Sequence, residues 1–183
     1  MKAAWAIQGI GFLCIIAAVL YLSSQSNEPT PQAPMHDSML IRSPAWNHEE
    51  RIPAKYSCSG EDTSPPVAID AAPRGTQSFV LIMDDPDAPG GTWDHWIVFN
   101  IPKDTTRIGE GDTPPGVSGT NSWGRLGYGG PCPPPGSEHR YLMKVFALDT
   151  ILDLPEGASK TDIEKAMEGH VLERSTLMGR FSR

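Results

Sequence analysis

The longest run of hydrophobic residues in this chain lies near its N-terminal end, between residues 3 and 22. This run contains no charged residue and only one polar side chain, Gln8. About 20 apolar residues are enough for a helix to cross a bilayer, so the pattern predicts a transmembrane anchor within residues 1–22. A cleaved signal peptide is the alternative, because residues 24–26 offer small side chains for a cleavage site.

The residues that follow this run are polar and show no hydrophobic periodicity. Residues 23–38 are rich in Ser, Gln, Asn and Pro, which bury too little surface to offset the entropy of ordering, so we predict a flexible linker. Lys2 precedes the apolar run, whereas Glu28 and Asp37 follow it. The positive-inside rule then predicts a single-pass protein with its N-terminus in the cytoplasm and its domain outside. If the segment is cleaved, we expect a secreted or periplasmic protein.

Short hydrophobic runs separated by turn residues fill residues 39–183 and predict a single β-rich domain. The clearest run is Ser78–Met83, which is too short for a buried helix and rich in β-forming residues, so we predict a central strand. Apolar residues occupy both alternating positions of the run from 140 to 149, which predicts burial of both faces. The other predicted strands are residues 39–42, 67–69 and 95–101.

One helix is predicted, close to the C-terminal end. Thr161-Asp162-Ile163-Glu164 has the Thr-x-x-Glu form of a capping box, and Gly169 is a natural stop. Residues 172–183 fit either a second helix or a final strand, and their Ser, Thr and Gly content favours the strand. Together the elements predict a mainly β fold, with a sandwich of two antiparallel sheets as its architecture.

Composition narrows the classes of function. The chain has 183 residues, of which 39% are hydrophobic and 20% are charged, enough to bury one substantial core. Its formal net charge of −7 leaves no basic stripe that could follow a phosphate backbone, so we do not expect nucleic-acid binding. The segment from 103 to 138 is rich in Gly and Pro and has no apolar run, which favours an ordered functional loop between two strands.

Cysteine usage agrees with export. Cys14 lies in the N-terminal apolar segment, whereas Cys58 and Cys132 lie in loops rich in Gly, Pro and Ser. In an oxidising compartment these two could form a disulfide. Two half-buried thiols that never meet are the alternative, and the sequence leaves both possibilities open.

Polar side chains gather where predicted strands begin or end. They are Asp85 and Asp87, Asp94 and His95, and His139, Arg140 and Tyr141. Imidazole and phenol groups supply hydrogen-bond donors, and successive amides near Gly129-Gly130 could form a positive nest. If these strand ends converge, we expect an anion site in which Asp85 fixes the orientation of a histidine. The structural alternatives are a plain Asp-Pro-Asp turn and half-buried histidines.

Four ordered blocks make this region recognisable: Asp85-Pro-Asp-Ala-Pro89, Asp94-His95-Trp96-Ile-Val-Phe-Asn100-Ile-Pro102, Tyr128-Gly-Gly-Pro-Cys-Pro-Pro134 and His139-Arg140-Tyr141. They resemble the phosphatidylethanolamine-binding protein family, also called the Raf kinase inhibitor protein family. Three further stretches look like its bacterial and archaeal branch: Tyr56–Gly60, Ser64–Pro66 and Glu168–Leu172. The resemblance extends from about Met39 to Arg183.

The resemblance implies a β-sandwich of two antiparallel sheets with short helices near the C-terminus. It also implies a small surface pocket for phosphate or a phosphorylated head group, with no cofactor and no metal. The family's ligand-binding residues carry over onto Asp85, Pro86, His95, Gly130, Pro131, His139 and Tyr141. Some members have two adjacent histidines where this chain has Asp94-His95, so an extra acid beside the pocket is expected to weaken anion binding.

We therefore expect a membrane-tethered binding protein for a small anionic ligand. The alternatives are an inhibitor of a protease or signalling protein and, less favoured, a hydrolase. Ser137 near His139 suggests acyl transfer, and histidines with aspartates could hold a metal. The sequence has no His-x-x-x-His spacing and no complete nucleophile elbow, so we do not expect an enzyme.

Overall fold

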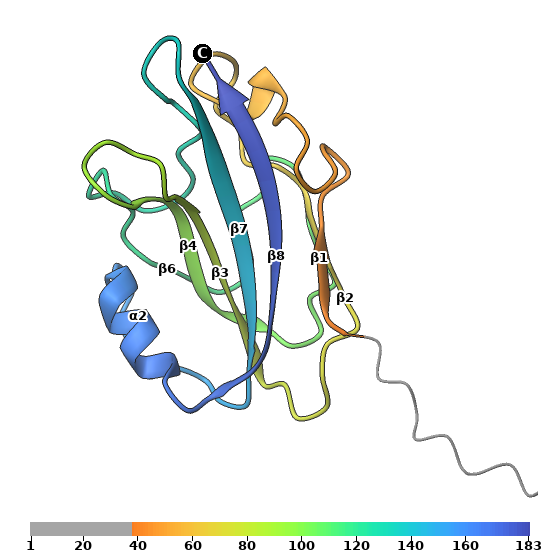
Figure 1. Cartoon of the computed structure of the whole chain (residues 1–183). Coiled ribbons are helices and arrows are strands. Elements are labelled where there is room, and N and C mark those ends of the chain that lie inside the picture. The colour runs from red at the N-terminus through yellow and green to blue at the C-terminus, as the bar shows by residue number, and fades with distance from the viewer. Residues whose placement is uncertain (1–37) are drawn as a thin grey trace, which may run out of the picture. The chain divides into compact units, whose positions relative to one another are not determined.

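The computed structural model describes residues 38–183, which form two antiparallel β-sheets and one α-helix (Figure 1). The predicted anchor over residues 1–22 and most of the predicted linker over residues 23–38 lie outside the described residues. Within the described part of the chain, no helix has the length and hydrophobicity needed to cross a membrane.

The larger sheet has five strands in the order β6-β4-β3-β7-β8. These are β3 (Ser78–Asp85), β4 (Trp93–Pro102), β6 (Val117–Ser118), β7 (Glu138–Leu148) and β8 (Val171–Ser182). The smaller sheet has the order β1-β2-β5, with β1 (Leu40–Arg42), β2 (Val67–Asp70) and β5 (Arg107–Ile108). A short 3-10 helix, η1 (Ala54–Tyr56), lies between β1 and β2 in sequence. The predicted mainly β fold with two antiparallel sheets is confirmed.

Strand β3 lies at the centre of the larger sheet because hydrophobic residues cover both of its faces. All eight of its residues are buried. Phe79, Leu81 and Met83 belong to a core cluster that also contains residues of the smaller sheet, so this face fills the space between the sheets. Val80 and Ile82 belong to a second cluster with residues of the helix. The continuous apolar run thus confirms the prediction of a central strand.

Strand β7 is buried less evenly than predicted. Its residues Tyr141, Met143, Val145 and Ala147 are fully buried in the core between the sheets. On the opposite face, Leu142, Lys144 and Phe146 are only half-buried, because one short helix covers that face incompletely. The prediction of a strand buried on both faces is therefore right for one face and only partly right for the other.

Helix α2 (Lys160–Met167) begins two residues before the start that the predicted capping box implied. Ser159 is the N-cap, and its Oγ accepts a hydrogen bond from the Asp162 amide at 3.2 Å. The prediction that Thr161 caps the helix was wrong, because Ser159 offers the same hydroxyl acceptor one half-turn earlier. The helix ends just before Gly169, which has a φ of +79° and is suited to ending a helix.

The strand register brings three polar strand ends to one end of the larger sheet. Asp85, the last residue of β3, pairs with Trp93 at the start of β4. Strand β7, which begins at Glu138, lies on the other side of β3 and pairs with β8 along its whole length. The residues that open β4 and β7 therefore lie beside the residue that ends β3, as the sequence pattern required for an anion site.

Candidate functional site

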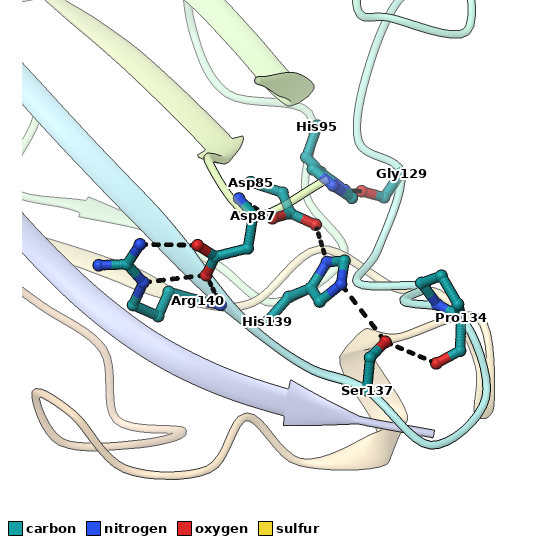
Figure 2. A network of polar contacts seen from close by, with 8 residues as sticks. All are labelled: Asp85, Asp87, His95, Gly129, Pro134, Ser137, His139 and Arg140. Atoms are coloured by element: carbon teal, nitrogen blue, oxygen red, sulfur yellow. Dashed lines mark hydrogen bonds and ion pairs between the residues drawn. The ribbon is translucent and has the colours of Figure 1, made fainter. Parts of the chain in front are cut away.

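A buried hydrogen bond between Asp85 and His139 forms the centre of this end of the sheet (Figure 2). The distance from His139 Nδ1 to Asp85 Oδ2 is 2.7 Å, and the two side chains are only 7% and 5% exposed. The carboxylate accepts, so Nδ1 carries the hydrogen and Nε2 points away from Asp85. The other carboxylate oxygen accepts the Asp87 amide at 2.8 Å, which fixes the Asp85 side chain. Asp85 thus orients His139, as predicted for a carboxylate behind a histidine.

His95 is held by a backbone carbonyl instead of a carboxylate. Its Nδ1 lies 2.7 Å from the carbonyl oxygen of Gly129, so Nδ1 carries the hydrogen and donates it (Figure 2). Burial lowers the pKa of His95, while the hydrogen bond to Gly129 and the charge of Asp85 raise it by less. The resulting ring is neutral near pH 7, with Nε2 as the nitrogen left for a ligand.

The Tyr141 side chain lies between these groups and carries an unsatisfied donor. Its ring makes an edge-to-face contact with His95, with the ring centroids 5.2 Å apart. Its hydroxyl is buried and forms no hydrogen bond of ordinary length and angle within residues 38–183, although the Asp85 side chain and the Cys132 backbone lie close to it. Burial and, secondly, the negative charge of Asp85 raise the pKa of Tyr141 far above its ordinary value, so the hydroxyl keeps its proton. A buried hydroxyl without a partner costs about 1–3 kcal/mol, which an incoming acceptor would recover.

The glycine loop does not offer the predicted nest of free amides. The Gly129 amide donates to the His95 carbonyl at 3.0 Å, and the Gly130 amide donates to Asp62 Oδ1 at 2.7 Å. Gly130 also packs too tightly for any side chain, because a Cβ there would lie 2.4 Å from the carbonyl oxygen of Tyr56. The prediction that these two amides face an anion was wrong, since both hydrogens already have acceptors in the protein.

The loop that contains Gly130 is instead fastened to the loop that follows η1. Cys58 and Cys132 form a disulfide between the two loops, with an S–S distance of 2.12 Å and a Cα–Cα distance of 5.4 Å. The Cys58 amide also donates to the carbonyl oxygen of Pro131 at 3.2 Å. Of the two alternatives that the sequence left open, the structure therefore has the disulfide. Pro131 is buried in this contact, whereas Pro86 is half-buried in the turn after β3.

The Asp94 side chain pairs with a lysine of the helix and not with a histidine. Its Oδ1 is 2.8 Å from Nζ of Lys160, the first residue of α2. Neighbouring residues of a strand point to opposite faces, so Asp94 faces the helix while His95 faces the core between the sheets. Lys160 offsets part of the charge of this carboxylate, which still raises the pKa of His95. The effect of Asp94 on anion binding stays a prediction.

Asp87 and Arg140 form an ion pair at the surface next to the buried groups (Figure 2). Arg140 donates to both carboxylate oxygens, with Nε at 2.9 Å from Oδ2 and Nη2 at 2.6 Å from Oδ1. This guanidinium lowers the pKa of Asp87 to about 2. Asp87 therefore tethers the start of β7 to the turn after β3. The turn alternative had this carboxylate accept amides of its own loop, which the Asp85 carboxylate does instead.

The three side chains that could contact an anion are almost completely buried. His95 is 2% exposed, His139 is 6% exposed and Tyr141 is 1% exposed. A ligand that reaches them must therefore pass between the loops that surround them. Trp123 is the exposed residue next to them, since its ring lies 5.0 Å from the His95 ring and directly against Gly129.

Comparison with known proteins identifies the family. The family model described as phosphatidylethanolamine-binding protein matches residues 42–182, which include both sheets except the first two residues of β1. The chain belongs to the phosphatidylethanolamine-binding protein family. The match includes every strand end that forms the candidate site, so the resemblance seen in the four sequence blocks is confirmed.

Relatives in this family come from archaea and bacteria. A protein of Methanothermobacter thermautotrophicus named UPF0098 protein is 50% identical over 151 residues, which span 79% of this chain and 99% of the relative. An Aquifex aeolicus protein of the same name is 48% identical over 153 residues, which span 79% of this chain and 89% of the relative. Both are similar along nearly their whole length, yet their name assigns neither a ligand nor a reaction.

Solved structures of the phosphatidylethanolamine-binding protein family have the same fold. A homolog from Chlamydia trachomatis superimposes with a TM-score of 0.77 at 39% identity, covering 80% of this chain and 98% of that chain. YbcL from E. coli, described as a member of the mammalian family, gives a TM-score of 0.75 at 29% identity, covering 80% and 99%.

Of the seven residues that the resemblance implied for ligand binding, the structure brings four side chains into mutual contact or close range: Asp85, His95, His139 and Tyr141. The other three, Pro86, Gly130 and Pro131, shape and fasten the surrounding loops. Sequence reasoning missed Asp62, which occupies the Gly130 amide, and Trp123, which covers His95. A tryptophan between polar residues and glycines in a long functional loop was the available signal for Trp123.

Proposed function

We propose that this protein binds a small anion, a phosphate or a phosphorylated head group, at His95, His139 and Tyr141. The observation that carries the proposal is the buried Tyr141 hydroxyl without a partner, beside the His95 ring. An oxygen of an anion would accept this hydrogen bond. Hydrogen bonds that involve an ionised partner are about twice as strong as neutral ones, so an anion is a better acceptor here than water.

The two histidines can donate to an anion only from Nε2 and only when protonated, because their Nδ1 atoms are already engaged. Gly129 and Asp85 accept from them, so each ring can present only Nε2 to a ligand. In a neutral ring this nitrogen is an acceptor, which does not suit an anion. Anion binding therefore favours the protonated form of His95, with Nε2 as a second donor beside the Tyr141 hydroxyl.

The proposal extends to an exported protein tethered to the membrane by residues 1–22. Two observations support an extracytoplasmic location. The first is the apolar segment itself. The second is the Cys58–Cys132 disulfide, a bond that persists mainly in oxidising compartments. The single-pass orientation places the N-terminus in the cytoplasm, and cleavage of the segment would give a secreted or periplasmic protein.

Titration calorimetry with phosphate and phosphoethanolamine tests the binding site. We expect binding heat for the unchanged protein and its loss in His139→Ala. His170→Ala is the matched control, because His170 also pairs with an aspartate, Asp149 at 2.8 Å, but at the opposite end of β8. No heat with the unchanged protein, or equal heat with His139→Ala, would rule out the proposed site.

Fractionation of cells that express the full chain tests the location. We expect the protein in the membrane fraction, with the domain accessible to protease added outside the cytoplasm. A variant that lacks residues 1–22 is the control and should remain in the cytoplasm. Protection of the full chain from protease in intact spheroplasts would contradict the proposed orientation.

A further inference from the structure

Ser137, His139 and Asp85 form a continuous chain of polar contacts that the anion site does not require (Figure 2). Ser137 Oγ lies 3.4 Å from His139 Nε2, and His139 Nδ1 lies 2.7 Å from Asp85 Oδ2. A hydroxyl, an imidazole and a carboxylate in this order are the groups of an activated serine nucleophile. We propose that these three residues transfer the acyl group of small carboxylic esters to water.

The local sequence holds the serine in this position. Ser137 closes a turn in which its amide donates to the carbonyl oxygen of Pro134 at 3.1 Å, directly before β7 begins. His139 follows two residues later on the strand itself, and Asp85 comes from the end of β3. Consecutive prolines restrict the turn, so the hydroxyl is held near the ring at little entropic cost.

Acyl transfer needs a nucleophile that solvent can reach and a base that is protected from it. Ser137, His139 and Asp85 differ in exposure in this way. Ser137 is half-exposed, so an ester can approach its oxygen from solvent. His139 and Asp85 are 7% and 5% exposed in their side chains, which protects the base and the group that orients it. Tyr141 follows on the same face of β7, and its unpartnered hydroxyl is available as a donor to a carbonyl oxygen.

The serine hydroxyl is not yet turned towards the histidine. It donates to the carbonyl oxygen of Pro134 at 2.7 Å, while 3.4 Å to Nε2 is longer than a working hydrogen bond. Rotation about the Cβ–Oγ bond moves this hydrogen from Pro134 to Nε2 without moving the oxygen. Such contacts are commonly long in ligand-free enzymes and shorten when substrate binds.

The reaction follows from these positions. Ser137 Oγ forms a bond to the acyl carbon as its proton moves to His139 Nε2, and that proton passes to the departing alcohol oxygen as the ester C–O bond breaks. Water then attacks the acyl-serine, giving a proton to Nε2 that returns to Oγ when the acid leaves. The Nδ1 hydrogen stays on the ring, where the Asp85 carboxylate stabilises the imidazolium in both steps.

Covalent labelling of the full-length protein tests the proposal. We expect a fluorophosphonate probe to modify Ser137, as located by peptide mass spectrometry, and p-nitrophenyl acetate hydrolysis to fall at least 100-fold in Ser137→Ala. Ser59→Ala, which changes an exposed serine in another loop, is the matched control and should keep both activities. Asp85→Asn should slow labelling and change its pH profile, because Asp85 acts through His139.

An unlabelled Ser137, or equal hydrolysis by the unchanged protein and Ser137→Ala, would overturn the proposal. Phosphate titration of the same variants separates it from the anion site. If phosphate binding releases heat but Ser137 is not labelled, the anion site is supported and the triad is ruled out. If Ser137 is labelled but phosphate gives no heat, the triad is supported and the anion site is ruled out. If both exist, phosphate should slow labelling, because both use Nε2 of His139.

Discussion

The hydroxyl of Tyr141 gives a direct prediction, because the folded protein buries it without a partner. Tyr141→Phe removes the hydroxyl, so we expect the ligand-free protein to gain about 1 kcal/mol in unfolding free energy. The same variant should lose most of the stabilisation that added sulfate gives to the unchanged protein. Urea unfolding with and without sulfate measures both effects.

A second tyrosine serves as the control for this experiment. The Tyr56 hydroxyl donates to Glu110 at 2.6 Å, so Tyr56→Phe should lose about 1–2 kcal/mol instead of gaining stability. Equal responses of the two variants would contradict the assignment of Tyr141 as an unsatisfied donor.

His95 makes anion affinity depend on pH. Burial lowers its pKa in the free protein, so the ring is neutral near pH 7, while a bound anion favours the protonated ring. Affinity for sulfate, which does not titrate in this range, should therefore increase as the pH falls from 8 to 6, by at most about tenfold per pH unit. The increase should level off below the pKa of His95 in the free protein. Calorimetry at several pH values measures it.

His95→Gln removes the titrating group and should flatten this pH profile. Asp85 and Asp94 are the charged neighbours that raise the pKa of His95, and both remain in the variant. If the sulfate affinity of His95→Gln still increases as the pH falls, another group takes up the proton.

Among the loops, the contact between Gly130 and the segment at the end of η1 leaves no room for a side chain. A Cβ at residue 130 would lie 2.4 Å from the carbonyl oxygen of Tyr56 and 2.8 Å from Cα of Ser57, and backbone atoms cannot move aside cheaply. We expect Gly130→Ala to lower the unfolding free energy by about 2 kcal/mol or more. Gly90→Ala is the control, because nothing lies within 4 Å of its Cβ, and should change stability by less than about 0.5 kcal/mol. Chemical denaturation of both variants decides.

Strands and helix could be predicted from sequence to the extent that their signals are local. The run at Ser78–Met83 predicted β3 because a strand covered on both faces needs continuous hydrophobicity, and residues 172–183 were correctly favoured as the strand β8. The cap of α2 was misplaced because Ser159 and Thr161 carry equivalent hydroxyls and only the backbone conformation distinguishes them. The two-residue strands β5 and β6 gave no signal, since tertiary pairing alone defines them.

The histidines, Asp85 and Tyr141 of the candidate site could be predicted because strand ends of one sheet meet at one edge. The acceptors that pair with the amides of Gly129 and Gly130 could not be predicted. Asp62 is separated from Gly130 by 68 residues, and nothing in either stretch indicates that its carboxylate occupies the Gly130 amide. The Lys160 partner of Asp94 could not be predicted, because the direction of the Asp94 side chain depends on the strand register, which includes a bulge after Met83.

The disulfide should raise the unfolding free energy of the whole domain, because it closes a long loop in the unfolded chain. Cys58 and Cys132 are 74 positions apart, and the chain-entropy treatment gives about 3–5 kcal/mol for such a loop. We expect the double variant Cys58→Ser, Cys132→Ser to lose stability of this order in urea unfolding. The unchanged protein under a reducing agent is the comparison and should lose a similar amount. A loss below about 1 kcal/mol would show that the loops are held mainly by their hydrogen bonds.

The chain enters the domain far from the histidines. The amide of Met39 donates to Glu173 near the beginning of β8, whereas His139 pairs with Phe181 near its end. Eight residues of strand separate these two levels, which corresponds to about 25 Å. A domain immobilised at residue 38 would therefore have the sheet end that contains Tyr141 and the histidines on the side away from the support. Surface-based binding assays can use that attachment without blocking ligand entry.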